Sequence, residues 1–207
     1  MPPDAAQIRA RRAAFRQLHR TGCFAIPNPW DVGSARWLAR LGFKALATTS
    51  SGYAWSQGRP DGAVPLAQVL AHLRDMVAAT ELPVNADFEH GFADDAEGVA
   101  RNVRAAIATG VAGLSIEDST GDPAAPLLPL PEAVARMRAA RAAIDDSSED
   151  VLLIGRAENF FVGRPDLQDA IARLRAYAEA GADCLDGGGL LAGVGGGRVE
   201  AVGAGLG

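Results

Sequence analysis

The feature of this 207-residue chain that most constrains its fold is an alternation of short apolar runs with longer helical segments. The apolar runs predict six strands: Cys23–Pro27, Lys44–Thr48, Pro83–Asp87, Ala112–Ile116, Val151–Gly155 and Ala182–Leu185. Apolar residues at three- and four-residue spacing predict five helices between them: Val32–Leu41, Leu66–Thr80, Asp94–Thr109, Pro131–Ile144 and Pro165–Ala180. Because strands that alternate with helices pair in parallel through right-handed crossovers, the pattern predicts an α/β fold.

Two parallel architectures are compatible with this alternation, a doubly wound open sheet and a (β/α) barrel. No phosphate-binding glycine loop follows the first predicted strand, which argues against a dinucleotide-binding sheet. Polar residues follow strand after strand, as at the active-site face of a barrel. We therefore expect a TIM-type (β/α)8 barrel, incomplete or altered after the sixth strand. Residues 1–185 would form the barrel domain, and residues 186–207 a Gly-rich tail that is irregular or reflects a changed reading frame.

The composition narrows the classes of partner. The chain has 20 Lys and Arg against 25 Asp and Glu, a net charge of -5, which argues against a nucleic-acid or anionic-membrane partner. No apolar run approaches the roughly 18 residues of a membrane span. The two cysteines, Cys23 and Cys184, lie in strand-like stretches and are predicted to be buried thiols in a reducing compartment. We expect a cytoplasmic protein.

Acidic residues gather where predicted strands end. Asp87 closes one apolar strand, Glu89 follows two residues later, and Glu117 ends the next strand, while Asp61 lies in the long loop after the second strand. Carboxylates that converge on one site repel each other unless a hard cation neutralises them. Oxygen ligands suit Mg²⁺ or Mn²⁺, so the sequence predicts a divalent metal site.

Arg156 directly follows a buried strand, which is a costly place for a cation without an anionic partner. Its planar guanidinium could bind a substrate carboxylate through two parallel hydrogen bonds. A salt bridge to Glu117 or Glu158 is the alternative. The small-residue turn Thr48–Tyr53 could hold a carboxylate oxygen through its backbone N–H groups.

Other polar residues have structural interpretations. Asp31 and Asp118 are expected to cap the helices that follow them. His19 and His72 are predicted to lie on helix surfaces, whereas His90 is near the acidic residues. The three histidines lack the spacing of zinc ligands.

Six motifs, taken in order, resemble the isocitrate lyase/phosphoenolpyruvate mutase superfamily. Within it, the chain is most similar to the mutase-like branch of phosphonomutases and methylisocitrate lyase-like proteins. The motifs are Asn28-Pro29-Trp30-Asp31, Thr49-Ser50-Ser51-Gly52, Gly58-Arg59-Pro60-Asp61-Gly62, Asp87-Phe88-Glu89-His90-Gly91-Phe92, Ser115-Ile116-Glu117-Asp118 and Gly155-Arg156-Ala157-Glu158. The resemblance runs from about Phe15 to Leu185.

The resemblance implies roles for individual residues. Asp87 would contact Mg²⁺ most directly, and the remaining metal-site residues would hold its waters or complete the shell: Asp61, Glu89 and Glu117. The carboxylate of a 2-oxo acid would be bound by Ser50, Ser51, Gly52 and Arg156. Arg156 and Glu117 would be the catalytic residues.

The resemblance also implies an activity, because the family's shared chemistry passes through a metal-bound enolate. The chain would be a Mg²⁺-dependent lyase, active as a homo-oligomer, that cleaves a C–C bond in a small 2-oxo or 2-hydroxy di- or tricarboxylate. It would be oxaloacetate decarboxylase-like or methylisocitrate lyase-like. The family's lyases carry a Lys-Lys/Arg-Cys-Gly-His loop, whereas residues 119–126 contain no Cys, Lys or His, which favours decarboxylation over isocitrate cleavage. A phosphonomutase or other P–C bond enzyme and a non-catalytic 2-oxo acid binder are the alternatives.

Overall fold

The strands form one parallel sheet in the computed structural model, which describes residues 2–189. The strands are β1 (Leu46–Ala47), β2 (Val84–Asp87), β3 (Gly113–Glu117), β4 (Leu152–Ala157) and β5 (Cys184–Gly187). They lie side by side in sequence order, β1-β2-β3-β4-β5, and every neighbouring pair is parallel. This order has no reversal point of the doubly wound kind. The sheet is a curled, five-stranded half-barrel.

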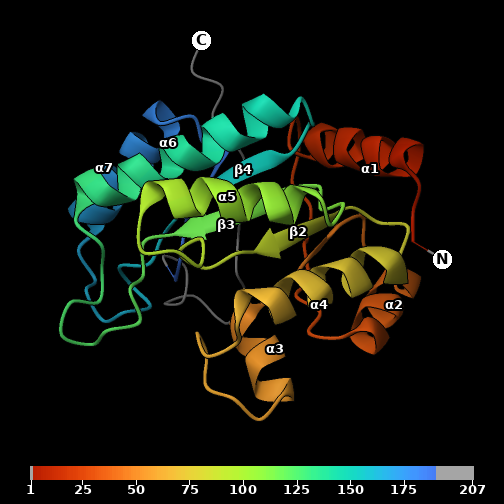
Figure 1. Cartoon of the computed structure of the whole chain (residues 1–207), viewed down its shortest axis with the longest axis horizontal. Helices are drawn as coiled ribbons and strands as arrows, with labels where there is room; N and C mark the ends of the chain where they lie inside the picture. The colour runs from red at the N-terminus through yellow and green to blue at the C-terminus, as the bar shows by residue number, and fades with distance from the viewer. Residues whose placement is uncertain (1, 190–207) are drawn as a thin grey trace.

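Seven helices surround this sheet in the part of the chain that the structure describes. They are α1 (Ala5–Leu18), α2 (Val32–Arg40), α3 (Ser50–Ser56), α4 (Leu66–Ala79), α5 (Ala96–Ile107), α6 (Leu130–Ser147) and α7 (Leu167–Glu179). Figure 1 shows α5, α6 and α7 side by side along one side of the sheet, and α4 and α2 continue this layer. Asp31 caps α2 as predicted, and Asp95 and Asp166 cap α5 and α7.

The two faces of the sheet bury separate apolar clusters. Leu153 packs on the side of helices α4–α7, while its neighbours Leu152 and Ile154 pack on the opposite side with Phe15 of α1. Successive side chains of a strand point to opposite faces, which explains this division. Gly113 admits Phe15 to the opposite side, because a Cβ atom there would lie 2.7 Å from Phe15 Cε1. We call this second side the inner face.

The predicted strand Cys23–Pro27 is wrong, because this segment is not a strand. It does lie beside β1, where the Ala47 N–H donates to the Pro27 carbonyl oxygen at 3.0 Å. Asn28 Nδ2 then donates to the Ala47 carbonyl oxygen at 3.1 Å. Pro27 and Pro29 have no N–H groups, so they cannot continue a ladder of backbone hydrogen bonds.

Two local predictions also need correction. The expected turn Thr48–Tyr53 is largely helical, because Ser50 begins α3. Cys23 is exposed, which contradicts the prediction of a buried thiol, whereas Cys184 is buried as expected.

The end of the sheet lies slightly beyond its predicted boundary. β5 runs to Gly187, two residues past the strand end expected at Leu185. The predictions for the rest of the tail concern residues 190–207, which lie outside the described residues.

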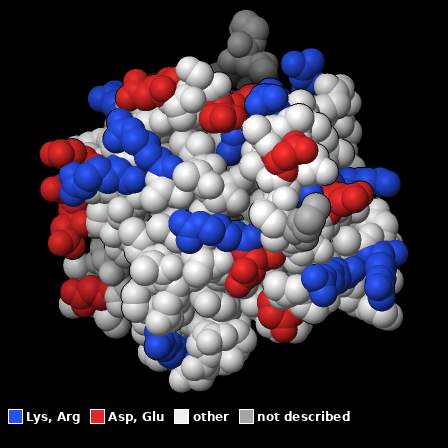
Figure 2. Space-filling view, turned by 45° about the vertical axis from the view of Figure 1, so that its right-hand side comes forward, with Lys and Arg blue, Asp and Glu red and all other residues white. Residues whose placement is uncertain are grey.

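Two observations describe the molecule's exterior. Figure 2 shows acidic and basic side chains intermixed on the face it draws, so neither sign forms a continuous field there. Within residues 2–189, every helix is too short or too polar to span a bilayer.

Arg12 fastens α1 to the rest of the fold. It is buried, and its guanidinium donates to the Val111 carbonyl oxygen at 3.0 Å and to the Ile107 carbonyl oxygen at 2.9 Å, and it pairs with Glu149.

Because hydrogen bonds from charged groups are stronger than neutral ones, Arg12→Met should lower the free energy of unfolding by about 2–3 kcal/mol. Urea denaturation measures this change. The matched variant Arg9→Met removes an exposed arginine of the same helix and should change stability by less than about 0.5 kcal/mol. Equal losses in the two variants would contradict the anchoring role.

Candidate active site

Charged side chains from four neighbouring strands meet at the carboxyl end of the inner face. Register pairs Glu117 of β3 with Arg156 of β4, and Arg156 with Asp186 of β5. Asp87 of β2 pairs with Ser115, which lies two residues before Glu117 and therefore on the same face. The parallel register thus brings together three acids and one arginine that are separated by up to about 100 positions in the sequence.

Arg156 is the centre of this group. Its Nη1 lies 3.2 Å from Glu117 Oε2 and 3.3 Å from Asp87 Oδ1. Its Nε pairs with Glu158 and lies 3.9 Å from Asp186 Oδ2. Burial alone lowers the pKa of Arg156, but the charges of the surrounding acids, Glu117 first among them, together outweigh burial and raise this pKa, so the guanidinium stays charged. The sequence allows a salt bridge from Arg156 to Glu117 or to Glu158 as an alternative to substrate binding, and both salt bridges are present.

Asp87 is held from two sides. Its Oδ2 accepts hydrogen bonds from the Ser50 N–H at 3.0 Å and from the Ser50 hydroxyl at 3.2 Å. Its own N–H donates to Thr48 Oγ1 at 2.9 Å. Because Ser50 is the first residue of α3, the partial positive charge at that helix terminus also favours the Asp87 carboxylate.

Ser51 and Gly52 contribute to the cap of α3. The Gly52 N–H donates to Thr49 Oγ1 at 3.2 Å, and Ser51 Oγ lies 3.2 Å from the same oxygen. A Cβ atom at Gly52 would lie 2.6 Å from Thr49 Cγ2, so this position requires glycine. Of the three predicted substrate-binding residues on α3, Ser50 lines the cleft described next, and Ser51 and Gly52 are not among its lining residues. Their role in substrate binding stays a prediction.

A cleft of about 430 Å³ opens above these strand ends, and the predicted metal-site acids Asp61, Glu89 and Glu117 line it. The other lining residues are Ser50, Gly62, Ala63, His90, Ser119, Thr120 and Gly121. Glu89 has a left-handed backbone with φ of 45°, which is strained for a non-glycine residue. The Glu89 carbonyl oxygen accepts the Glu117 N–H at 2.9 Å, which ties the two acidic segments together.

The acids of the cleft are crowded. Burial raises the pKa of Glu89 to about 8, and the charges of Asp87 and Asp61 add to this rise. Burial also raises the pKa of Glu117 well above its ordinary value, although the charge of Arg156 opposes the rise. The site holds four carboxyl groups, those of Asp61, Asp87, Glu89 and Glu117, beside the single guanidinium of Arg156.

This donor set fits a divalent cation that keeps part of its hydration shell. Among residues 2–189, no three His, Cys, Asp or Glu side chains are arranged as a ready-made metal-binding group. Mg²⁺ characteristically uses one or two carboxylates and retains several waters. Asp87 could provide a direct carboxylate ligand, and Glu89 and Asp61 could hold metal-bound waters. Such an ion would offset the repulsion among these carboxylates.

Asp118 is not a helix cap, which corrects the prediction. It is buried and accepts hydrogen bonds from the Glu158 N–H at 2.9 Å and from Arg173 Nη1 at 3.1 Å. The Tyr177 hydroxyl also donates to it. Asp118 thus fixes the segment that carries Glu158, a direct partner of Arg156.

The three histidines lie in different surroundings. His72 is buried and not on a helix surface, and its ring stacks on Tyr53 with centroids 3.7 Å apart. His19 is partly buried at the end of α1, where its Nδ1 lies 2.8 Å from the Phe15 carbonyl oxygen. His90 lines the cleft, near the acids as expected.

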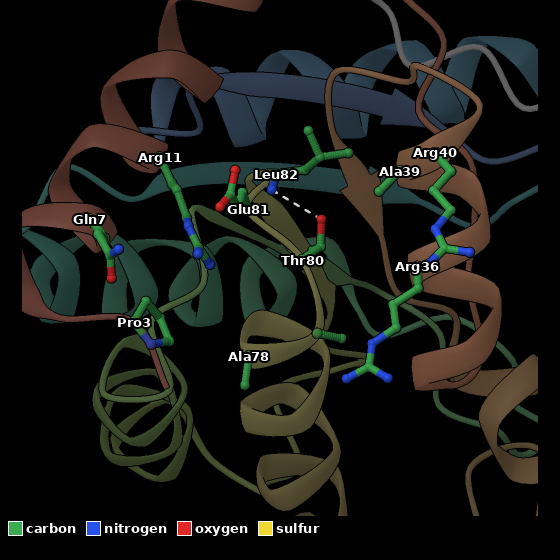
Figure 3. A pocket seen from close by; sticks show the side chains of 11 residues that line it. Pro3, Gln7, Arg11, Arg36, Ala39, Arg40, Ala78, Thr80, Glu81 and Leu82 are labelled. Carbon is green, nitrogen blue, oxygen red and sulfur yellow. Dashed lines mark hydrogen bonds between the residues drawn. The ribbon is translucent and has the colours of Figure 1, made fainter. Parts of the chain in front are cut away.

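A second hollow, of about 560 Å³, lies at the opposite end of the sheet. Figure 3 shows Arg11 of α1 and Arg36 of α2 reaching over the end of α4 from its two sides. Arg11 donates to the Val77 carbonyl oxygen at 2.8 Å. Cations at the carboxyl end of a helix stabilise its dipole, which accounts for these arginines structurally. The carboxylates of the cleft do not line this hollow, so the cleft is the candidate site.

The raised pKa of Glu89 predicts a pH-dependent stability. The fold raises this pKa from 4.5 to about 8, so the folded protein holds a proton that the unfolded chain releases between these values. In metal-free protein, the free energy of unfolding should therefore fall as the pH rises from about 4 to about 8. Glu89→Gln removes this group and should reduce the fall by roughly 1–3 kcal/mol, measured by urea denaturation across the range. Glu97→Gln, at an exposed site on α5, is the control. If Glu89→Gln and wild type showed the same pH dependence, Glu89 would not titrate in this way.

The comparisons with known proteins agree with this geometry. The sequence matches the phosphoenolpyruvate phosphomutase family over residues 15–190. The 2-methylisocitrate lyase of Escherichia coli is 36% identical over 181 residues, covering 83% of this chain and 60% of the enzyme. The oxaloacetate decarboxylase of Paraburkholderia xenovorans is 32% identical over 186 residues, covering 84% of this chain and 60% of the enzyme. The chain thus spans about three fifths of the length of these relatives.

A solved structure shows the same fold. A protein from Burkholderia cenocepacia J2315, described as a lyase/mutase, is 48% identical and superposes with a TM-score of 0.84, covering 86% of this chain and 65% of that chain. The family match includes every strand of the sheet and all the charged residues that meet at its carboxyl end. The resemblance predicted from the motifs is confirmed, and the chain belongs to the isocitrate lyase/phosphoenolpyruvate mutase superfamily.

Proposed function

We propose that this chain is a Mg²⁺-dependent lyase that cleaves a C–C bond in a small 2-oxo or 2-hydroxy di- or tricarboxylate. The observation that carries the proposal is the buried ion-pair cluster of Arg156 with Asp87 and Glu117, of which Glu117 also lines the cleft. The names of the two relatives, an oxaloacetate decarboxylase and a 2-methylisocitrate lyase, support this substrate class. We also propose that the half-barrel is part of a (β/α)8 barrel.

In this proposal Asp87 is the residue nearest to Mg²⁺ or Mn²⁺, with Asp61, Glu89 and Glu117 holding its waters. Ser50 fixes the Asp87 carboxylate through two hydrogen bonds, which leaves its remaining lone pairs available. A divalent cation bound there would supply Lewis-acid stabilisation of the charge that develops on the 2-oxo group.

Arg156 and the loop over the cleft determine which cleavage is favoured. When the C–C bond breaks, its electron pair stays on the pyruvate-like fragment as an enolate, whose charge Arg156 is placed to offset. The loop is closed by an antiparallel bridge between Ser119 and Leu127, and Ser119, Thr120 and Gly121 line the cleft. Cleavage of a hydroxy acid requires a base to remove the hydroxyl proton, and this loop offers no Cys, Lys or His. Loss of CO₂ requires no such base, so decarboxylation of a 2-oxo dicarboxylate is favoured.

The first test of this function is a panel of small acids with and without EDTA. Wild-type protein with Mg²⁺ should convert oxaloacetate to pyruvate and CO₂ faster than Mg²⁺ alone, and EDTA should abolish the increase. Asp87→Ala should lose metal-dependent turnover and Mn²⁺ binding by calorimetry, because it removes the best-fixed carboxylate. Asp122→Ala, which removes an exposed carboxylate of the loop after β3 that does not line the cleft, is the control. Unchanged Mn²⁺ affinity in Asp87→Ala would refute the metal assignment.

The second candidate is P–C bond chemistry, which the phosphomutase description of the matched family favours. The same panel should include phosphonopyruvate, since turnover of this compound in place of oxaloacetate would establish the alternative. Metal-dependent binding of 2-oxo acids without turnover of any compound would instead identify a non-catalytic binder.

A separate prediction concerns the guanidinium of Arg156. Arg156→Lys keeps the positive charge but loses the planar pair of donors, so affinity for pyruvate or oxalate should fall by about 1–3 kcal/mol. Calorimetry with Mg²⁺ present measures this loss. Arg12→Lys makes the same change at a buried arginine remote from the cleft and should leave affinity unchanged. If Arg156→Lys bound these ligands like wild type, Arg156 would serve only the internal ion pairs.

A further inference from the structure

His72 is a buried polar residue that the proposed function does not use. It lies on α4 with 8% of its surface exposed, and its ring is parallel to that of Tyr53 within 10°. Its Nε2 is closed to solvent and has no hydrogen-bond partner among residues 2–189. Buried ring nitrogens are nearly always partnered in folded proteins, so this atom calls for a partner.

A small cavity of about 10 Å³ adjoins this ring. That volume matches the space needed by a single water molecule. Asp87, Glu89 and Ser50 line the cavity on the side of the candidate site, and His72 and Tyr53 line it on the side of α4. Val64, Val69 and Leu73 make part of its wall apolar. Its polar lining residues, among them Asp87, Glu89 and Ser50, can supply the two to four hydrogen-bonding groups that a buried water requires.

The surroundings of His72 favour a neutral ring. Burial lowers the pKa of His72 to about 4, although the charges of Asp75 and Asp31 oppose the shift. His72 also lines an outer groove of about 400 Å³ together with Trp30 and Gln68. Because Nε2 is closed to solvent, the water-sized cavity is better suited than this open groove to supply its partner.

We propose that one water molecule binds in this cavity between His72 Nε2 and the carboxylates of Asp87 and Glu89, which makes His72 a positioning residue for the acidic site. The neutral ring donates from Nε2–H to the water oxygen, and the water donates to a carboxylate oxygen. Stacking on Tyr53 fixes the ring, and Tyr53 belongs to the same helix, α3, as Ser50, which fixes Asp87. The effect on metal binding, though not the water site itself, rests on the proposed function.

The water site is tested directly by a crystal structure of the wild-type protein. We expect a water peak about 2.6–3.2 Å from His72 Nε2 and from an Asp87 or Glu89 oxygen. Side-chain ¹⁵N NMR should show a neutral His72 ring protonated at Nε2 at pH 7. A cavity filled by a protein side chain, or an Nε2 bonded directly to a protein group, would overturn the proposal.

The positioning role is tested with two substitutions and one control. His72→Phe keeps the stack on Tyr53 but removes both nitrogens, while His72→Gln returns an amide near the position of Nε2. Residues that orient metal ligands without touching the metal typically change metal affinity about ten-fold or more when they are mutated. We therefore expect His72→Phe to weaken Mn²⁺ binding by roughly ten-fold in EPR titrations. His72→Gln should restore part of this loss. His19→Phe, at the end of α1, should bind Mn²⁺ like wild type.

The outcomes separate this inference from the proposed function. If His72→Phe bound Mn²⁺ as tightly as wild type while Asp87→Ala no longer bound it, the positioning role would be overturned and the metal site would stand. If wild type bound no Mn²⁺ while the crystal structure contained the bridging water, the proposed metal-dependent function would fail and the water site would stand.

Discussion

The arrangement of the inner face depends on the positive charge of Arg156. Asp87 and Glu117 lie within 3.3 Å of its guanidinium, Glu158 pairs with it, and Asp186 lies 3.9 Å away. Burying several carboxylates together without a counter-charge would cost several kcal/mol for each ion. The guanidinium makes their close approach possible. Burial, together with the charges of Asp87 and Asp61, still raises the pKa of Glu89.

A second layer of contacts holds Arg156 and its partners in place. Asp118 accepts the backbone N–H of Glu158 and is itself bound by Arg173 and Tyr177 of α7. Ser50 of α3 fixes Asp87 on the other side of the site. The outer helices therefore position the charged residues of the sheet through buried polar contacts as well as through apolar packing.

Sequence periodicity could predict the parts of the structure that depend on local pattern. The predicted strands ending at Asp87 and Ile116 and the position of Arg156 agree with the structure to within one or two residues, because buried parallel strands read as continuous apolar runs. The prediction of a strand at Cys23–Pro27 is wrong because it rests on the apolar residues of this segment and does not take into account that proline has no N–H group for a strand hydrogen bond.

Other features depend on long-range contacts that no local pattern reports. Asp118 resembled a helix cap because its partners Arg173 and Tyr177 lie more than 50 positions away. The prediction that His72 lies on a helix surface is wrong because the sequence does not show that Tyr53 of α3 stacks on its ring. Asp186 could have been found, since it follows buried Cys184 at the two-residue spacing of one strand face.

The register of the sheet has a consequence for how the chain assembles. Glu117 lies opposite Arg156, and Arg156 lies opposite Asp186. A slip of one residue in β4 would turn Arg156 toward the apolar helix layer and place Gly155 or Ala157 opposite the acids. Such a misaligned sheet would bury an unpaired cation and leave adjacent carboxylates without a counter-charge. The charges at the strand ends therefore favour the native alignment of β4 over a slip of one residue, which the apolar side chains on both faces of this strand distinguish less strongly.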